Sequence, residues 1–162
     1  MATQGTFEVN ATDVYKRFTE LSIKEMKKAV TAGVRKGLAV VRNKARKTFR
    51  SIFPTGAKKN PKYHDKLIDG IRSTKVKETG KGDIMGYVLI TSNRKHGSGS
   101  YRLVFLEGGT VKRQTRRGYN RGSIKASYFF TRSVNSTNQE YNKAMVEAID
   151  QTIDKINQAN LK

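Results

Sequence analysis

Apolar residues recur at helical spacing through the first third of the chain and again near its end. From position 26 they step by three or four residues, at Met26, Val30, Val34, Leu38, Val41, Ala45 and Phe49. This spacing predicts a long helix over residues 12–52, with Thr12 as its N-cap. Pro54-Thr55-Gly56 ends it, because proline cannot continue a helix. The same spacing over residues 138–157 predicts a C-terminal helix.

Two glycines, Gly33 and Gly37, lie inside the first predicted helix. Each weakens a helix by about 1 kcal/mol relative to alanine. They therefore indicate either a kink near residues 33–37 or a place where another backbone approaches this helix closely.

Shorter apolar segments between the two helices have the β-branched character of strands. Strands are expected at residues 71–77, 84–91 and 101–106, and the glycine-rich connection 79–83 predicts a hairpin. The aromatic segment 126–134 is expected to return to the core.

Taken together, these elements predict one α+β domain spanning residues 1–162. The long N-terminal helix and the C-terminal helix are expected to pack on a small antiparallel β-sheet of three to four strands. Within residues 71–134 the expected arrangement is a β-meander with basic loops.

The charge of the chain is large and uneven. Its 162 residues include 33 Lys and Arg against 13 Asp and Glu, a net charge of +20. Residues 1–23 and 133–162 each sum to −1, so residues 24–132 carry +22. A field of this size attracts phosphate groups or acidic protein surfaces.

Residue usage excludes several kinds of protein. The chain has no cysteine, which excludes disulfides, thiolate metal sites and a cysteine nucleophile, and it has only two histidines, His64 and His96. No apolar run reaches the roughly 20 residues that span a bilayer. Residues 1–8 lack the apolar core of a secretory signal. We therefore expect no membrane span, no metal and no cofactor.

No catalytic motif stands out. The glycine runs at residues 96–100 and 107–110 do not match a phosphate-binding loop. Glu107, beside Gly108 and Gly109, is the acid best placed for a functional role, and a small metal-dependent nuclease would depend on it. A structural role, holding backbone N–H groups of the turn, is the stronger expectation. We expect a protein that is not an enzyme.

The loop at residues 112–125 contains only basic charges. Its cations are Lys112, Arg113, Arg116, Arg117, Arg121 and Lys125. A mobile loop of this kind can become ordered when it docks on an acidic surface. Together with Arg94 and Lys95 in the loop 92–100, it is the predicted interface with neighbouring subunits or partner proteins.

Non-specific nucleic-acid binding is the alternative function. Cations interleaved with aromatics, such as Tyr119 within the basic loop, suit phosphate contact combined with base stacking. The chain contains no helix-turn-helix, zinc-finger or RNP motif, so sequence-specific recognition is not supported.

The order of these segments resembles the tail-component family of long-tailed bacteriophages, the small head–tail joining or tail-completion proteins. The resemblance covers residues 29–157. Its motif residues, expected to be structural, are Pro54, Thr55, Gly56, Glu107, Gly108, Gly109, Thr110, Phe129 and Phe130. The chain departs from the family pattern at Gly108, where the family has an aromatic residue, and in an insertion at residues 57–65.

The resemblance implies a non-enzymatic structural protein of the virion, made in the host cytoplasm. Such proteins assemble as a ring, often six-fold, in the neck between the portal connector and the tail tube. The expected partners are therefore further copies of this chain and the phage connector and tail-tube proteins.

Overall fold

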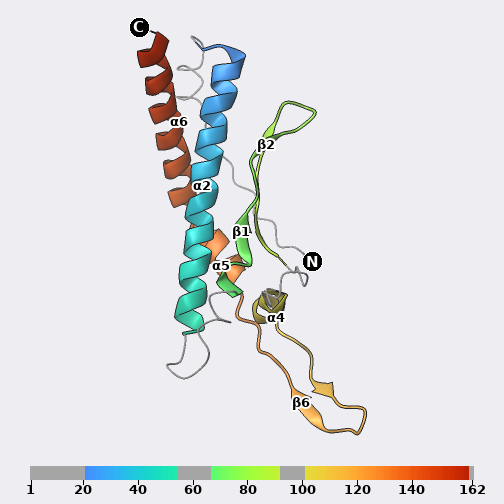
Figure 1. Ribbon diagram of the computed structural model, residues 1–162. Helices are drawn as coiled ribbons and strands as arrows, with labels where there is room; N and C mark the ends of the chain where they lie inside the picture. Colours follow the sequence, from blue (N-terminus) through green and yellow to red (C-terminus); the bar gives the residue numbers. More distant parts are fainter. Residues whose placement is uncertain (1–20, 55–66, 92–100, 161–162) are drawn as a thin grey trace.

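The computed structural model describes residues 21–54, 67–91 and 101–160 (Figure 1). It has the α+β class predicted from the sequence, with a long N-terminal helix, a C-terminal helix and antiparallel strand pairs. The helices are α2 (Ile23–Ile52), α4 (Arg102–Gly108), α5 (Phe129–Ser136) and α6 (Asn138–Asn160). None of the helices in these ranges combines the length and apolar character needed to cross a membrane.

Helix α2 ends at Ile52, as Pro54 predicts, but it begins later than the prediction of residue 12. Ser22 is its N-cap, and the predicted cap, Thr12, lies outside the described residues. Ser22 and Glu25 form a capping box, in which the Ser22 N–H donates to Glu25 Oε2 at 2.9 Å and the Glu25 N–H donates to Ser22 Oγ at 3.4 Å. The hydrogen bonds from the Ser22 side chain and backbone hold the pKa of Glu25 below its usual value.

The two glycines of α2 allow the close approach of α6, and the helix continues unbroken through them. A Cβ atom on Gly33 would lie 2.6 Å from Ile149 Cγ1 and 2.9 Å from the Met145 carbonyl oxygen. A Cβ atom on Gly37 would lie 2.6 Å from the ring of Tyr141. Of the two alternatives left open by the sequence, close packing is therefore the correct one.

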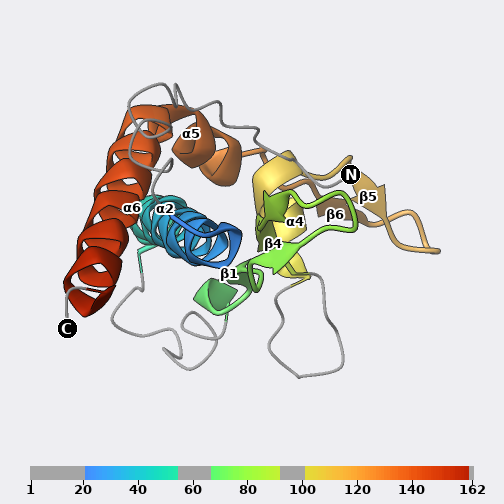
Figure 2. The ribbon, with the colours of Figure 1, turned by 90° about the horizontal axis from the view of Figure 1, so that it is seen from above.

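A two-stranded ribbon lies on the other side of α2 (Figure 2). In it, β1 (Ile71–Ser73) pairs antiparallel with β4 (Val88–Ile90), and β2 (Lys77–Glu78) pairs with β3 (Ile84–Met85). The predicted hairpin at residues 79–83 is confirmed. Arg46 of α2 fixes the ribbon by donating from Nε and Nη2 to the Ile71 carbonyl oxygen, at 3.1 and 3.0 Å.

The segment 101–106, predicted to be a strand, is helical from Arg102 onward and belongs to α4, with Tyr101 as the N-cap. Its buried residues, Leu103 and Glu107, are four positions apart, which is the period of a helix and not of a strand. Within residues 71–91 and 101–134, the strands therefore do not form the predicted three-stranded meander. In these described ranges they make three antiparallel pairs, the third between β5 (Arg113–Gln114) and β6 (Asn120–Gly122).

The aromatic segment returns to the core, as predicted, but it does so as helix α5. Phe129 and Phe130 are buried. The Phe129 ring packs edge-on against Phe49 of α2, with ring centroids 5.2 Å apart, and Phe53 lies 5.1 Å from Phe49. This cluster fixes α5 against the C-terminal half of α2.

Candidate protein-docking arm

Helix α4 lies next to the candidate site, and its residue Glu107 caps the N-terminus of helix α5. Glu107, 8% exposed, lies in the last turn of α4. Its Oε2 accepts from the Phe130 N–H at 2.8 Å, and its Oε1 accepts from the Thr131 N–H at 3.0 Å and from Thr131 Oγ1 at 2.7 Å. These N–H groups are at the start of α5, where the helix dipole favours a negative charge.

The sequence predicted that Glu107 holds backbone N–H groups of its own turn. In the structure it accepts hydrogen bonds from backbone N–H groups of α5 instead. The N-cap residue of α5, Tyr128, has a left-handed backbone (φ 50°) and makes no side-chain cap bond. The carboxylate from α4 takes its place. With both oxygens engaged in this cap, Glu107 acts as a link between α4 and α5.

Gly109 and Thr110 fix the base of a hairpin that follows α4. Gly109 has φ 73°, and a Cβ atom there would lie 2.8 Å from both the Ala126 nitrogen and the Ile124 carbonyl oxygen. The Thr110 N–H donates to the Ile124 carbonyl at 2.9 Å, and the Ile124 N–H donates to Thr110 Oγ1 at 2.9 Å. Thr110 thus joins the two ends of the hairpin to each other. The outgoing end is held to α4, because the Ser127 and Tyr128 N–H groups donate to the carbonyl oxygens of Leu106 and Glu107 at 3.0 and 3.1 Å; these contacts are here called the clamp.

Residues 111–125, here called the basic arm, project from this clamp away from α2 and α6 (Figures 1 and 2). The sequence predicted a loose loop, but strands β5 and β6 make it a hairpin. At its tip the Thr115 N–H donates to the Tyr119 carbonyl, and Thr115 Oγ1 accepts from the Tyr119 N–H at 3.0 Å. Gly118, with φ 80°, completes a tight turn that places Arg116 and Arg117 at the end of the arm.

The six predicted interface cations of the arm are all exposed, and none of them forms an ion pair with a residue in the described part of the chain. They are Lys112, Arg113, Arg116, Arg117, Arg121 and Lys125. The other two predicted interface residues, Arg94 and Lys95, lie outside the described residues. The structure therefore brings together six of the eight.

Exposed apolar side chains accompany these cations. Val111 at the base of the arm is 81% exposed and Tyr119 near its tip is 70% exposed. Val104 and Phe105 of α4 and Tyr128, next to the clamp, are also exposed. Exposed aromatic side chains and arginines are both enriched in protein–protein interfaces relative to the rest of a protein surface.

Val104 and Phe105 were not predicted as surface residues, because a strand at 101–106 would have placed them in the sheet. No signal in the sequence could have revealed their exposure, because the helical spacing of Leu103 and Glu107 depends on the burial of a glutamate, which only the structure shows. Of the remaining motif residues, Pro54 is exposed directly after α2, Gly108 ends α4 in open space, and Thr55 and Gly56 lie outside the described residues.

Within residues 21–54, 67–91 and 101–160, no three His, Asp or Glu side chains come together in a way that could hold a metal ion. Comparison of the chain with protein-family models, with curated proteins and with solved structures found no match.

Proposed function

We propose that this chain is a structural virion protein, a head–tail joining or tail-completion component of a long-tailed phage. It assembles as a ring in the neck, between the portal connector and the tail tube. The observation that carries this proposal is the basic arm, a hairpin with six exposed cations and exposed apolar side chains. Thr110 and Ile124 close its base, and the N–H groups of Ser127 and Tyr128 hold it to α4. The order of motifs along the chain supports the same family.

A projecting arm suits head-to-tail assembly, in which each subunit uses two different surfaces. The cap made by Glu107 and the contacts of Gly109 and Thr110 set the direction of the arm. A fixed direction reduces the ordering entropy lost on docking. In this proposal the arm contacts an acidic face of a neighbouring subunit or of the connector.

The test is head–tail joining in a phage extract that lacks this protein and accumulates separate heads and tails. The wild-type protein should restore joined particles, and the triple variant Arg113, Arg116 and Arg117→Ser should fold but restore far fewer. The control is a second triple variant, Lys24, Lys28 and Arg35→Gln. It removes an equal number of positive charges, but from α2 and not from the arm. Equal joining by the wild-type and arm-variant proteins would refute the role of the arm, and no joining by wild-type protein would refute the function.

Non-specific nucleic-acid binding is the second candidate function. Tyr119, which is 70% exposed among the cations of the arm, favours it, because an exposed aromatic ring can stack on bases. In that case the arm variant should lose most of its affinity for single-stranded DNA in a fluorescence-anisotropy titration. We prefer the structural function because Val111, Val104 and Phe105 add apolar surface that a nucleic-acid backbone would not use.

A further inference from the structure

A second basic surface runs along α2, separate from the arm. The helix carries ten cations and one acid, Glu25. Four of the cations face other elements and have partners there. Lys27 pairs with Glu78, Lys44 pairs with Glu140, Arg46 donates to the Ile71 carbonyl and Arg42 donates to Ser73 Oγ.

The other six cations are exposed, and none of them forms an ion pair with a described residue. We call them the helix face, which consists of Lys24, Lys28, Arg35, Lys36, Lys47 and Arg50. At about 1.5 Å per residue, the helix face extends for about 40 Å. Glu25 offsets part of this charge, because the hydrogen bonds that its carboxylate accepts from Ser22 and from Asn160 Nδ2, together with the charge of Lys28, keep it ionised; the six cations of the helix face still outnumber this one acid.

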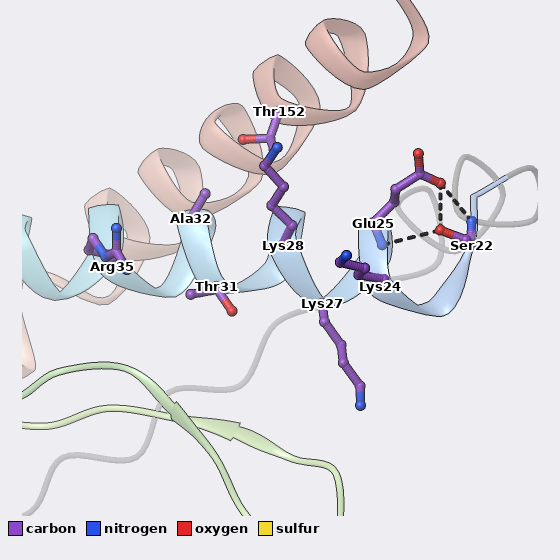
Figure 3. A pocket seen from close by; sticks show the side chains of 9 residues that line it. All are labelled: Ser22, Lys24, Glu25, Lys27, Lys28, Thr31, Ala32, Arg35 and Thr152. Carbon is purple, nitrogen blue, oxygen red and sulfur yellow. Dashed lines mark hydrogen bonds between the residues drawn. The ribbon is translucent and has the colours of Figure 1, made fainter. Parts of the chain in front are cut away.

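The N-terminal half of the helix face is hollowed where α2 meets α6 (Figure 3). Lys24, Lys28 and Arg35 line the hollow together with Thr152 of α6. In Figure 3 Lys28 extends toward Thr152, whereas Lys27 points away from it, in the direction of its partner on the ribbon. Lys155 of α6 lines the adjoining depression together with Lys28 and Glu25 of α2.

The helix face differs from the arm in what lies between its cations. Four of its six cations are lysines, and the exposed large apolar residues of α2, Ile23 and Ile52, are confined to the two ends of the helix. Protein interfaces are depleted of lysine and need apolar side chains at their centre. A row of lysines without such side chains instead suits phosphates, which a nucleic-acid duplex presents as a dense, regular line of charge.

We propose that the helix face of α2 binds the phosphate backbone of duplex DNA without sequence preference. The binding energy comes from the release of condensed counterions as the cations replace them on the phosphates. This binding is independent of the role proposed for the arm. It gives the protein a surface for DNA on one side and a surface for proteins on another.

The test is a fluorescence-anisotropy titration of the full chain with a labelled duplex of about 20 base pairs, which at about 3.4 Å per pair exceeds the length of the helix face. The test variant is Lys24, Lys28 and Arg35→Gln. The control is the arm variant Arg113, Arg116 and Arg117→Ser, which has the same net charge. Circular dichroism melting curves establish that both variants are folded.

Log affinity falls linearly with log salt concentration, and each lost phosphate contact reduces the steepness of this slope by about 0.9. The slope of the helix-face variant, which lacks three cations, should therefore be less steep than that of the wild-type protein by about 2.7. Between about 50 and about 200 mM salt, the affinity of the wild-type protein should therefore fall about 40-fold further than that of the helix-face variant. The arm variant should keep the wild-type slope. If the helix-face variant is unstable, the same test can be made on the other half of the helix face with the triple variant Lys36, Lys47 and Arg50→Gln.

Three results would overturn the proposal. Equal salt slopes for the helix-face and arm variants would mean that DNA affinity depends only on the net charge of the protein. A slope lost only in the arm variant would place DNA on the arm. No binding of the duplex by wild-type protein at about 50 mM salt would mean that the helix face meets an acidic protein or solvent instead.

Discussion

Replacing Glu107 by alanine should destabilise the protein far more than the loss of any exposed acid. The carboxylate makes three hydrogen bonds to the first turn of α5, two from the N–H groups of Phe130 and Thr131 and one from the Thr131 hydroxyl. Alanine would remove all three and leave the start of α5 without a cap. Glutamine would keep the shape of the side chain and one acceptor oxygen.

The magnitude follows from the number and kind of these bonds. A hydrogen bond to a charged group contributes about 1.5–3 kcal/mol, and loss of a helix N-cap costs about 0.5–2 kcal/mol. Because Thr131 is only half-buried, water can replace part of what is lost there. We expect about 3 kcal/mol for Glu107→Ala and about half of that for Glu107→Gln, which retains one acceptor.

Thermal unfolding followed by circular dichroism measures this effect. At about 2–4 °C per kcal/mol for a chain of this length, Glu107→Ala should lower Tm by about 9 °C. The control is Glu147→Ala, because the Glu147 side chain is 57% exposed and its ion pair with Lys143 contributes only about 0.3–0.5 kcal/mol. If Glu107→Ala shifted Tm no more than Glu147→Ala, the carboxylate would not be the cap of α5 and the argument would be wrong.

Two further substitutions test the packing of the fold, with Gly108→Ala as a near-neutral control because no atom lies within 4 Å of a Cβ at that position. Gly109→Ala should destabilise by about 2–3 kcal/mol in urea unfolding, since its φ of 73° and the atoms 2.8 Å away both oppose a side chain. A neutral result would show that the clamp is loose. Gly33→Ala should cost about 1–2 kcal/mol, because overpacking against Ile149 outweighs the gain of about 1 kcal/mol in helix propensity. A stabilised variant would contradict close packing of α2 on α6.

The long helices could be predicted because many residues repeat the same period. Pro54 fixed the end of α2, and the hairpin at residues 79–83 followed from its glycines. The start of α2 was missed although Ser22 and Glu25 carry a capping-box signature that is visible in the sequence. This signature lies ten residues after Thr12, the predicted cap, and it is the stronger of the two cap signals.

The segment 101–106 was predicted incorrectly for a different reason. A short apolar run has too few residues to separate a helical period from a strand period. What decides its structure is tertiary, since Leu103 enters the core and Glu107 reaches α5 at Phe130 and Thr131. Contacts between segments more than 20 residues apart leave no periodic trace in the sequence.

The candidate site was predicted in part. The cations of the arm were evident from composition, but their arrangement on an ordered hairpin depends on Thr110, Thr115 and Gly118, whose roles are local hydrogen bonds and a positive φ. The division of the cations of α2 into partnered and exposed groups also required the structure. It depends on which side of the helix the ribbon and α6 occupy.

The most direct test of the proposed function is the mass of the complex that this protein forms with the portal connector of the same phage, measured by size-exclusion chromatography with light scattering. Wild-type protein and the α2 variant Lys24, Lys28 and Arg35→Gln should both add a fixed number of copies to the connector. The arm variant Arg113, Arg116 and Arg117→Ser should remain separate from it. If all three proteins bound alike, or if wild-type protein left the mass of the connector unchanged, the account of the arm as the docking surface would be contradicted.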